Sequence, residues 1–204
     1  MSRESDKRAT TAAEMVSHVA RLAQGEGHAL GLTSAQWTAL RYFDRANRFS
    51  RTVTAFADYH ATTRGTASQT VKSLVTQGYL SRTRSSSDGR SARLDLTDKG
   101  RTLRVQDPFD ALIDAIADLP PALQTQLTAA LEHVMGRLAD DRGKRPFGTC
   151  TACSYLEECV CRQPDDADHL CAFIGQPLAD AELDEICINF EPGEGLSLKP
   201  SDGA

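Results

Sequence analysis

All six cysteines of this 204-residue chain lie between positions 150 and 187, and the first 149 residues contain none. Chance scattering does not explain such a cluster, so we expect the thiols to act together. The N-terminal residues lack the apolar core of a signal peptide, and no run of eighteen apolar residues predicts a membrane span. We therefore expect a cytoplasmic protein, in which clustered cysteines bind metal more often than they form disulfides.

Charge is divided unevenly along the chain. Residues 1–145 carry a net charge of +5 and residues 146–204 carry −10, which together give the overall value of −5. A basic part can face the phosphates of a nucleic acid while an acidic part stays in water. The overall negative charge alone argues against a nucleic-acid partner. Because the charge is divided in this way, that argument does not apply to residues 1–145.

Hydrophobic periodicity predicts helices through the first eighty residues. Residues 1–9 are polar and are expected to be frayed. Gly78 is expected to end the last of these helices, as glycine does at a helix C-terminus. The predicted helices cover 10–24, a segment that begins at a capping box of Thr33 and Gln36, 52–60, and a segment from Thr62 or Thr63 to Gln77.

The pattern then changes from helix to strand. Residues 79–97 predict two short strands around a polar tip that contains an Asp-Gly turn signal. Three further helices are expected, one capped by Thr97, one after the break at Asp107-Pro108, and one that starts at Pro120-Pro121.

This order predicts a mainly α fold with a small β wing: a winged helix-turn-helix with flanking dimerisation helices and a C-terminal metal-binding module. The expected domains are a DNA-binding and dimerisation domain over 1–145, a cysteine-rich module over 146–190 and a disordered tail over 191–204.

Residues 62–100 resemble the winged helix-turn-helix of the multiple-antibiotic-resistance regulator (MarR) family. The motifs that carry the resemblance are Gly78-Tyr79-Leu80 at the first strand, Asp88-Gly89-Arg90 at the wing tip and Leu96-Thr97-Asp98-Lys99-Gly100 at the return. The resemblance implies a homodimer whose two winged helix-turn-helix units face successive major grooves of double-stranded DNA. It therefore also implies a near-palindromic operator.

A recognition helix needs short polar side chains on its exposed N-terminal face, so that its backbone can enter the major groove. Gln69 is suited to reading adenine and Arg64 guanine, and hydroxyl side chains fit phosphate contacts. Arg90, oriented by Asp88, is the candidate for the minor groove. The predicted DNA-contacting residues are Thr63, Arg64, Thr66, Ser68, Gln69, Lys72, Arg82, Arg84, Asp88, Arg90 and Arg93.

The cysteine spacing predicts a metal or cluster site, because two thiolates three residues apart, as in Cys150-x2-Cys153, form a chelating loop. Aromatic residues stand near the cysteines, and the pattern resembles small modules that hold a [4Fe-4S] cluster. The expected ligands are Cys150, Cys153, Cys171 and Cys187, with Cys159, Cys161 and His169 as alternates. Zn²⁺ on the same thiolates and a metal-free set of thiols are the rival interpretations.

These features predict a transcriptional regulator, by preference a repressor. Its DNA affinity is expected to be set by an iron–sulfur cluster that senses redox state, oxygen, nitric oxide or iron. One alternative is a regulator that binds a small aromatic ligand in a cleft lined by Trp37, Tyr42 and Phe43, with a structural zinc site. A second is a redox or electron-transfer protein. The histidines lack acid and nucleophile partners at motif spacing, so we do not expect an enzyme.

Overall fold

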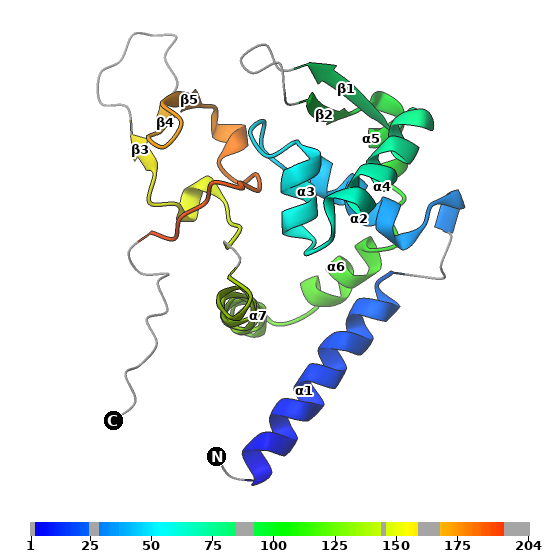
Figure 1. Ribbon diagram of the computed structural model, residues 1–204. Coiled ribbons are helices and arrows are strands. Elements are labelled where there is room, and N and C mark those ends of the chain that lie inside the picture. The colour runs from blue at the N-terminus through cyan, green and yellow to red at the C-terminus, as the bar shows by residue number, and fades with distance from the viewer. Residues whose placement is uncertain (1–2, 25–28, 85–91, 144–145, 159–167, 194–204) are drawn as a thin grey trace.

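The computed structural model describes residues 3–24, 29–84, 92–143, 146–158 and 168–193. Two long helices, α1 and α7, extend below a helical body that carries a β-hairpin, and a small three-stranded sheet lies on the side of α3 (Figure 1). The elements are α1 (Arg3–Leu22), η1 (Ala29–Gly31), α2 (Ser34–Arg45), α3 (Val53–Tyr59), α4 (Arg64–Thr76), β1 (Leu80–Arg84), β2 (Ala92–Leu96), α5 (Asp98–Arg104), α6 (Asp110–Ala117), α7 (Pro121–Asp141), η2 (Cys150–Ala152), β3 (Leu156–Glu158), β4 (His169–Cys171), β5 (Gln176–Leu178) and η3 (Asp180–Glu182).

Threonine side chains start the helices of the body, here called the reader (α2 to α5 with β1 and β2). The predicted capping box is present: Thr33 Oγ1 accepts from the Gln36 amide, and the Gln36 side chain accepts from the Thr33 amide. Thr63, rather than Thr62, caps α4. Gly78 follows α4 with a φ of +75°, a left-handed conformation that favours glycine and ends the helix as predicted.

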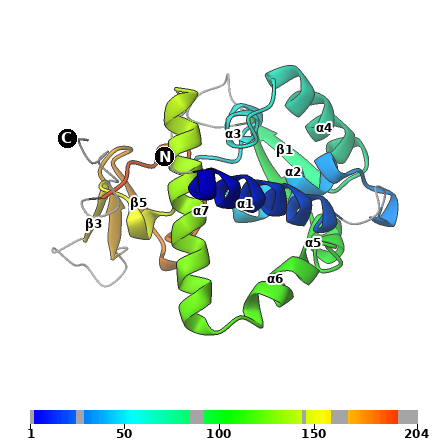
Figure 2. The ribbon, with the colours of Figure 1, turned by 90° about the horizontal axis from the view of Figure 1, so that it is seen from below.

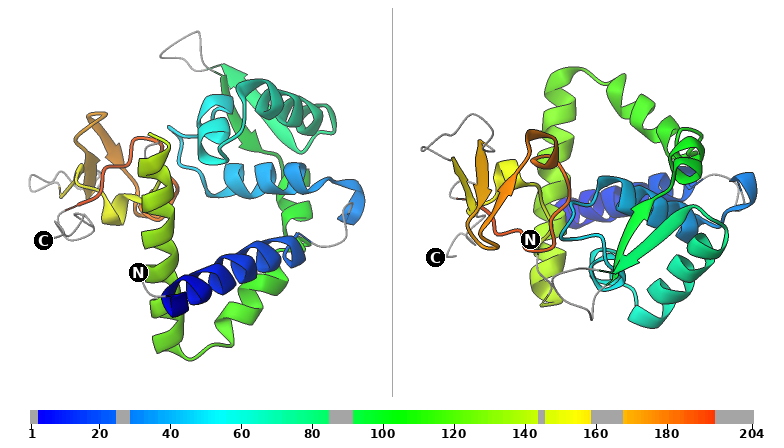
Figure 3. Two further views of the ribbon diagram at one scale, coloured as in Figure 1. Left: turned by 60° about the horizontal axis from the view of Figure 1, so that its bottom comes forward. Right: turned by 90° about the horizontal axis from the view of Figure 1, so that it is seen from above.

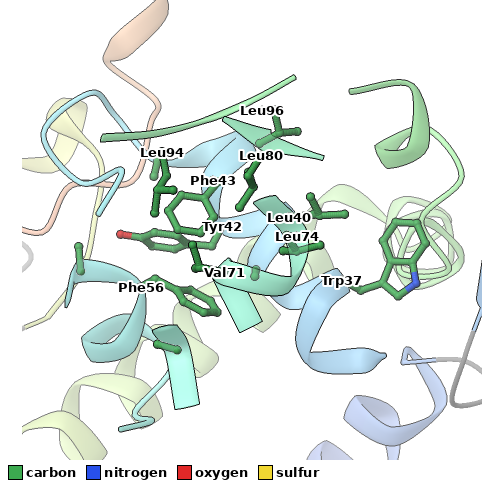
Figure 4. Close-up of a cluster of buried hydrophobic side chains, with 14 of the residues drawn as sticks. Trp37, Leu40, Tyr42, Phe43, Phe56, Val71, Leu74, Leu80, Leu94 and Leu96 are labelled. Carbon is green, nitrogen blue, oxygen red and sulfur yellow. The ribbon is translucent and has the colours of Figure 1, made fainter. Parts of the chain in front are cut away.

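The reader packs around one hydrophobic core. In Figure 4, aromatic side chains of α2 and α3 meet leucines from α4 and from both strands. Trp37, Tyr42 and Phe43 are buried in this core. The hairpin is antiparallel, and its register pairs Leu80 with Leu96. Local patterning therefore placed the elements of the reader correctly, because each helix has its own cap and each strand its own apolar face.

A buried ion pair sets the turn between α5 and α6, where the sequence showed only a proline break. Arg41 Nη1 on α2 lies 2.7 Å from Asp107 Oδ1, and the Asp107 side chain is fully buried. Asp107 Oδ1 also accepts from the Phe109 amide, 2.9 Å away. The carboxylate thereby fixes the direction in which α6 leaves the reader.

The two long helices bury little within one chain. The side chains over 4–22 are exposed, and neither α6 nor α7 contains a buried residue. The views in Figures 2 and 3 show α1 and α7 outside the packed body. The expectation that residues 1–9 are frayed is wrong from Arg3 onward, since α1 begins there, helped by acidic residues in its first turn. Within the described part of the chain, no helix has the length and apolar character to cross a membrane.

The C-terminal segment forms a module, here defined by the described residues 146–158 and 168–193. Its sheet has the order β3-β4-β5, with antiparallel pairing throughout. The tail predicted to be disordered from Glu191 onward is ordered over 191–193. The Ser154 amide donates to the Glu191 carbonyl at 2.8 Å, and the Gly193 amide donates to the Ala152 carbonyl at 3.0 Å. Residues 194–204 lie outside the described residues.

Candidate functional site

The first candidate site is the outer face of α4. Ala67, Val71 and Leu74 point into the reader core. The opposite face carries the predicted DNA-contacting residues of this helix, which are exposed: Arg64, Thr66, Ser68, Gln69 and Lys72. Thr63, the cap, is exposed at the start of the helix. The structure thus presents one polar surface, as a recognition helix requires.

Three of these residues also have local partners. Arg64 Nη2 donates to Thr54 Oγ1 of α3 at 2.7 Å, so the guanidinium is held beside the preceding helix. The hydroxyls of Thr63 and Thr66 lie 2.9 Å apart. The Thr63 hydroxyl therefore caps α4, because it accepts a hydrogen bond from the Thr66 amide.

The wing is described only in part. Arg82 on β1 is exposed. Arg93 on β2 is half-buried, and its Nε lies 3.0 Å from Asp95 Oδ1. The side chain of Arg84 and the whole of Asp88 and Arg90 lie outside the described residues. The predicted minor-groove contact of Arg90 remains a prediction.

The second candidate site is formed by the module, which brings the four predicted ligand cysteines from separate segments into one region. Cys150 and Cys171 pack in the same small core, together with Leu178. Cys187 lies opposite Gly148 in an antiparallel bridge, and its amide donates to the Gly148 carbonyl at 2.9 Å. Cys153 closes η2, where its amide donates to the Cys150 carbonyl at 3.0 Å.

The four thiols are close enough to affect one another's ionisation. Burial raises the pKa of Cys150 to about 12, with further contributions from Cys187, Cys153 and Cys171. Burial also raises the pKa of Cys187, and Cys153 and Cys171 add to the effect. Such thiols stay protonated at neutral pH unless a cation stabilises the thiolate, which is what a bound metal does.

A buried amide faces Cys187. Asn47 is 1% exposed, its Oδ1 accepts from the amide and hydroxyl of Ser50, and its Nδ2 has no hydrogen-bond partner. The Asn47 side chain and the Asn189 backbone amide both act to lower the pKa of Cys187. A buried donor without a partner is costly, and a thiolate at Cys187 is the acceptor that the site offers it.

The four described cysteines are all free thiols, the type of donor that a zinc ion or an iron–sulfur cluster requires. Within the described ranges, no three His, Cys, Asp or Glu side chains are arranged to hold a metal ion. A tetrahedral zinc site needs all four sulfurs about 2.3 Å from one centre. In a [4Fe-4S] cluster each cysteine binds a different iron, so the thiolates stand further apart.

Of the three alternate ligands, only His169 lies within the described residues. His169 on β4 lies with its Nδ1 3.3 Å from Asp180 Oδ1, so its imidazole faces a carboxylate. Cys159 and Cys161 lie outside the described residues. They stay candidates on sequence grounds alone.

The module docks on the loop between α2 and α3, residues 46–52, which the sequence did not indicate. Ile186 belongs to the reader core, and its amide donates to the Arg45 carbonyl at 2.7 Å. Arg48 pairs with Glu182 and also donates to the Pro177 carbonyl. Phe147 packs its ring edge-on against Tyr59 of α3, with centroids 5.0 Å apart. The module is thus attached to the DNA reader and not only to the end of α7.

Comparison with known proteins supports the winged-helix assignment. Residues 30–91 match the model of the MarR family. A MarR transcriptional regulator from Methanosarcina mazei Go1 has a similar fold, with a TM-score of 0.53 and 22% identity over 64% of this chain and 98% of that chain. A MarR family regulator from Streptomyces coelicolor, solved in complex with DNA, gives a TM-score of 0.53 and 22% identity over 66% and 88%.

A third similar structure is CouR from Rhodococcus jostii RHA1 bound to p-coumaroyl-CoA, with a TM-score of 0.51 and 20% identity over 59% of this chain and 88% of that chain. No curated protein matches the chain. At these identities the structural likeness establishes the fold, and the family model is matched by residues 30–91, less than half of the chain. The cysteine module lies outside that matched segment.

Proposed function

We propose that this protein is a transcriptional regulator that binds double-stranded DNA through α4 and the wing. The observation that carries the proposal is the exposed polar face of α4 on a MarR-type winged helix. The regulator from Streptomyces coelicolor, which shares this fold, was solved in complex with DNA. Gln69 reads a base edge in this proposal, and Lys72 contacts phosphate.

A homodimer is part of this proposal, and the unburied faces of the long helices support it. Apolar side chains that are exposed within one chain include Met15, Val16, Val19 and Leu22 on α1, and Leu123, Val134, Met135 and Leu138 on α7. Contiguous apolar surfaces of this kind mark interaction sites. Burying them between two copies places two readers on one near-palindromic operator.

The module adds the sensing part of the proposal. Cys150, Cys153, Cys171 and Cys187 would hold a [4Fe-4S] cluster, with Asn47 and the Asn189 amide as hydrogen-bond donors to Cys187. When bound, such a cluster supplies a redox-active group that oxygen or nitric oxide can attack. The protein contributes burial, which shields the site from water, and N–H donors, which stabilise thiolate charge. We propose that the cluster-loaded form is the one that binds the operator and represses transcription.

A regulator that binds a small aromatic ligand is the second candidate. Trp37, Tyr42 and Phe43, the residues suggested for its cleft, belong to the reader core. CouR, a protein of similar fold, was solved bound to p-coumaroyl-CoA. We place the cluster-based proposal first because the described part of the module brings four free thiols into one region.

A fluorescence-anisotropy titration with an operator fragment tests DNA binding. Lys72→Ala should weaken binding to every sequence alike and reduce its salt dependence, because a phosphate contact is lost. Gln69→Ala should instead relax preference at one base pair, by about 1–3 kcal/mol. Lys7→Ala, on the exposed surface of α1, is the control and should leave binding unchanged. If Lys72→Ala and Gln69→Ala both bind like the wild type, α4 is not the recognition helix.

Iron and sulfide analysis of anaerobically purified protein tests the cluster. We expect iron and inorganic sulfide in the wild type and their loss in Cys171→Ser. Stoichiometric zinc without sulfide would replace the cluster by a structural zinc site and leave the DNA-binding proposal intact.

A further inference from the structure

The loop between α2 and α3 lies between the cysteine module and the wing. On the module side, Ala46 forms a parallel bridge with Ile186, and the Asn47 amide donates to the Ile186 carbonyl at 2.9 Å. On the wing side, the Leu94 amide of β2 donates to the Arg51 carbonyl at 2.8 Å. One short segment of the reader therefore has main-chain contacts to both parts.

Arg51 joins the same two parts through its side chain. Its Nη1 lies 2.9 Å from Asp95 Oδ1 on β2, and its Nη2 lies 3.2 Å from Glu185 Oε1 in the module. Its Nε donates to the Ala46 carbonyl at 2.7 Å, which fixes the guanidinium plane. All three charged side chains are largely shielded from solvent, with 20–23% of each exposed. The donors of a planar guanidinium have fixed directions, so a shift of one bonded partner changes the geometry at the other partner.

The module end of this ion-pair network is next to the thiols. Glu185 stands two residues before Cys187, and Ile186 between them is anchored in the reader core. At the wing end, Asp95 also accepts from Arg93 Nε at 3.0 Å. A displacement of the Cys187 segment therefore reaches β2 through Glu185, Arg51 and Asp95 without passing through α7 or the dimer helices.

We propose that Glu185, Arg51 and Asp95 form a relay that couples occupancy of the cysteine site to the position of the wing. This inference rests on the proposed function and names the route of its regulation. The cluster state acts within each subunit, on the wing strand, in addition to any effect on subunit spacing. Two sites coupled in this way typically change each other's affinity by about 5- to 150-fold.

The test compares DNA affinity of the full chain in its metal-loaded and chelator-treated forms. For the wild type we expect a ratio within that range. Glu185→Gln keeps the shape of the side chain but removes the charge that holds Arg51, so the ratio should fall toward one while the iron content stays at the wild-type level. Glu182→Gln is the matched control: it weakens the neighbouring contact to Arg48, which docks the module without reaching the wing, and it should keep the wild-type ratio.

Hydrogen exchange at the Leu94 amide provides a readout that is independent of DNA. Exchange should quicken on metal removal in the wild type and in Glu182→Gln, and should be insensitive to metal in Glu185→Gln. A wild-type ratio retained in Glu185→Gln overturns the relay and leaves the proposed function standing. Equal losses in both variants also overturn it, since docking alone would then explain the coupling. A wild-type ratio of one, with unchanged exchange, overturns the relay and the sensing role of the module, whereas loss of DNA binding in both forms would overturn the proposed function.

Discussion

At the residue scale, the most informative side chains are buried polar groups whose bonding is incomplete. Asn47 keeps Ser50 in place through Oδ1 and leaves Nδ2 facing Cys187. His60 is packed among the rings of Tyr42, Phe56 and Tyr59, and its Nε2 has no partner. Neither residue stands out in the sequence. The role of each depends on its burial and on the direction of one side-chain nitrogen, Nδ2 of Asn47 and Nε2 of His60.

Asn47→Asp should weaken metal retention. The change preserves Oδ1 for Ser50 but replaces the N–H donor by a negatively charged oxygen beside the Cys187 thiolate. Changes in groups that support a metal ligand typically cost about 10- to 100-fold in affinity, and competition with a chelator measures the loss. Asn189→Asp is the control, since Asn189 uses its backbone amide and the variant adds a nearby charge without removing a donor. Equal affinities for Asn47→Asp and the wild type would contradict this role for Asn47.

His60 should make the protein less stable in acid. Burial, with a smaller effect of Arg41, lowers the pKa of His60 to about 4 from 6.5. Between these values the unfolded chain binds a proton that the folded chain does not, so the free energy of unfolding falls as the pH drops through this window. Above it the residue contributes no pH dependence. In His60→Phe, the decline between pH 6.5 and 4, measured by urea unfolding, should be shallower than in the wild type.

At the scale of elements, close backbone approaches hold the module and the hairpin in place. Gly148 lies opposite Cys187, and a Cβ at this position would stand 2.6 Å from the Phe190 ring. Gly100 of α5 meets the Tyr79 carbonyl so closely that a Cβ has no space there. Both glycines are needed because a neighbouring element occupies the volume of the missing side chain. Gly136, in the exposed helix α7, has open space within 4 Å of the point that a Cβ would occupy.

Gly148→Ala should therefore loosen the module. Overpacking of this kind costs about 1–3 kcal/mol, and the module should be cleaved by protease at lower concentration while the reader stays resistant. Gly136→Ala should stabilise by about 0.5–1 kcal/mol, since alanine loses less conformational freedom than glycine in a helix. Limited proteolysis with mass spectrometry distinguishes the two segments. Equal resistance of the module in Gly148→Ala and the wild type would mean that Phe190 moves aside without cost.

At the scale of the whole molecule, the chain consists of a packed reader with a docked module and two long helices that pack on little else. The reader and the module share a core through Ile186. In the proposed dimer, the apolar faces of α1 and α7 would pack against a second copy of the chain. The proposed subunit contact is then separate from the loop that contacts the module.

Leu138→Glu should convert the dimer to a monomer, because it buries a charge in the proposed subunit contact. Light scattering coupled to gel filtration measures the mass. The monomer should lose most of its operator affinity, since two half-sites no longer bind together. Arg137→Glu, also exposed on α7 but not part of the apolar face, is the control and should remain dimeric. A Leu138→Glu variant that stays dimeric would move the subunit interface elsewhere.

Local signals in the sequence predict the helices and strands of the reader. Thr33 with Gln36, Thr63 before α4, Gly78 after it and the alternation of Leu94 and Leu96 are local signals, and each acts within a few residues of its partner. The clustering of the cysteines is also visible in the sequence, and the choice of four of them as ligands stays a prediction. The position of the module depends on tertiary contacts, because the contacts that hold it link residues far apart in the chain. Arg51 meets Glu185 across 134 positions and Ser50 meets Ile188 across 138. Hydrophobic periodicity does not predict such pairs, because they form between chain segments that meet only after the reader has folded. The N-terminus also departs from the prediction, since the polar residues at the start of α1 form a helix where the sequence predicted fraying.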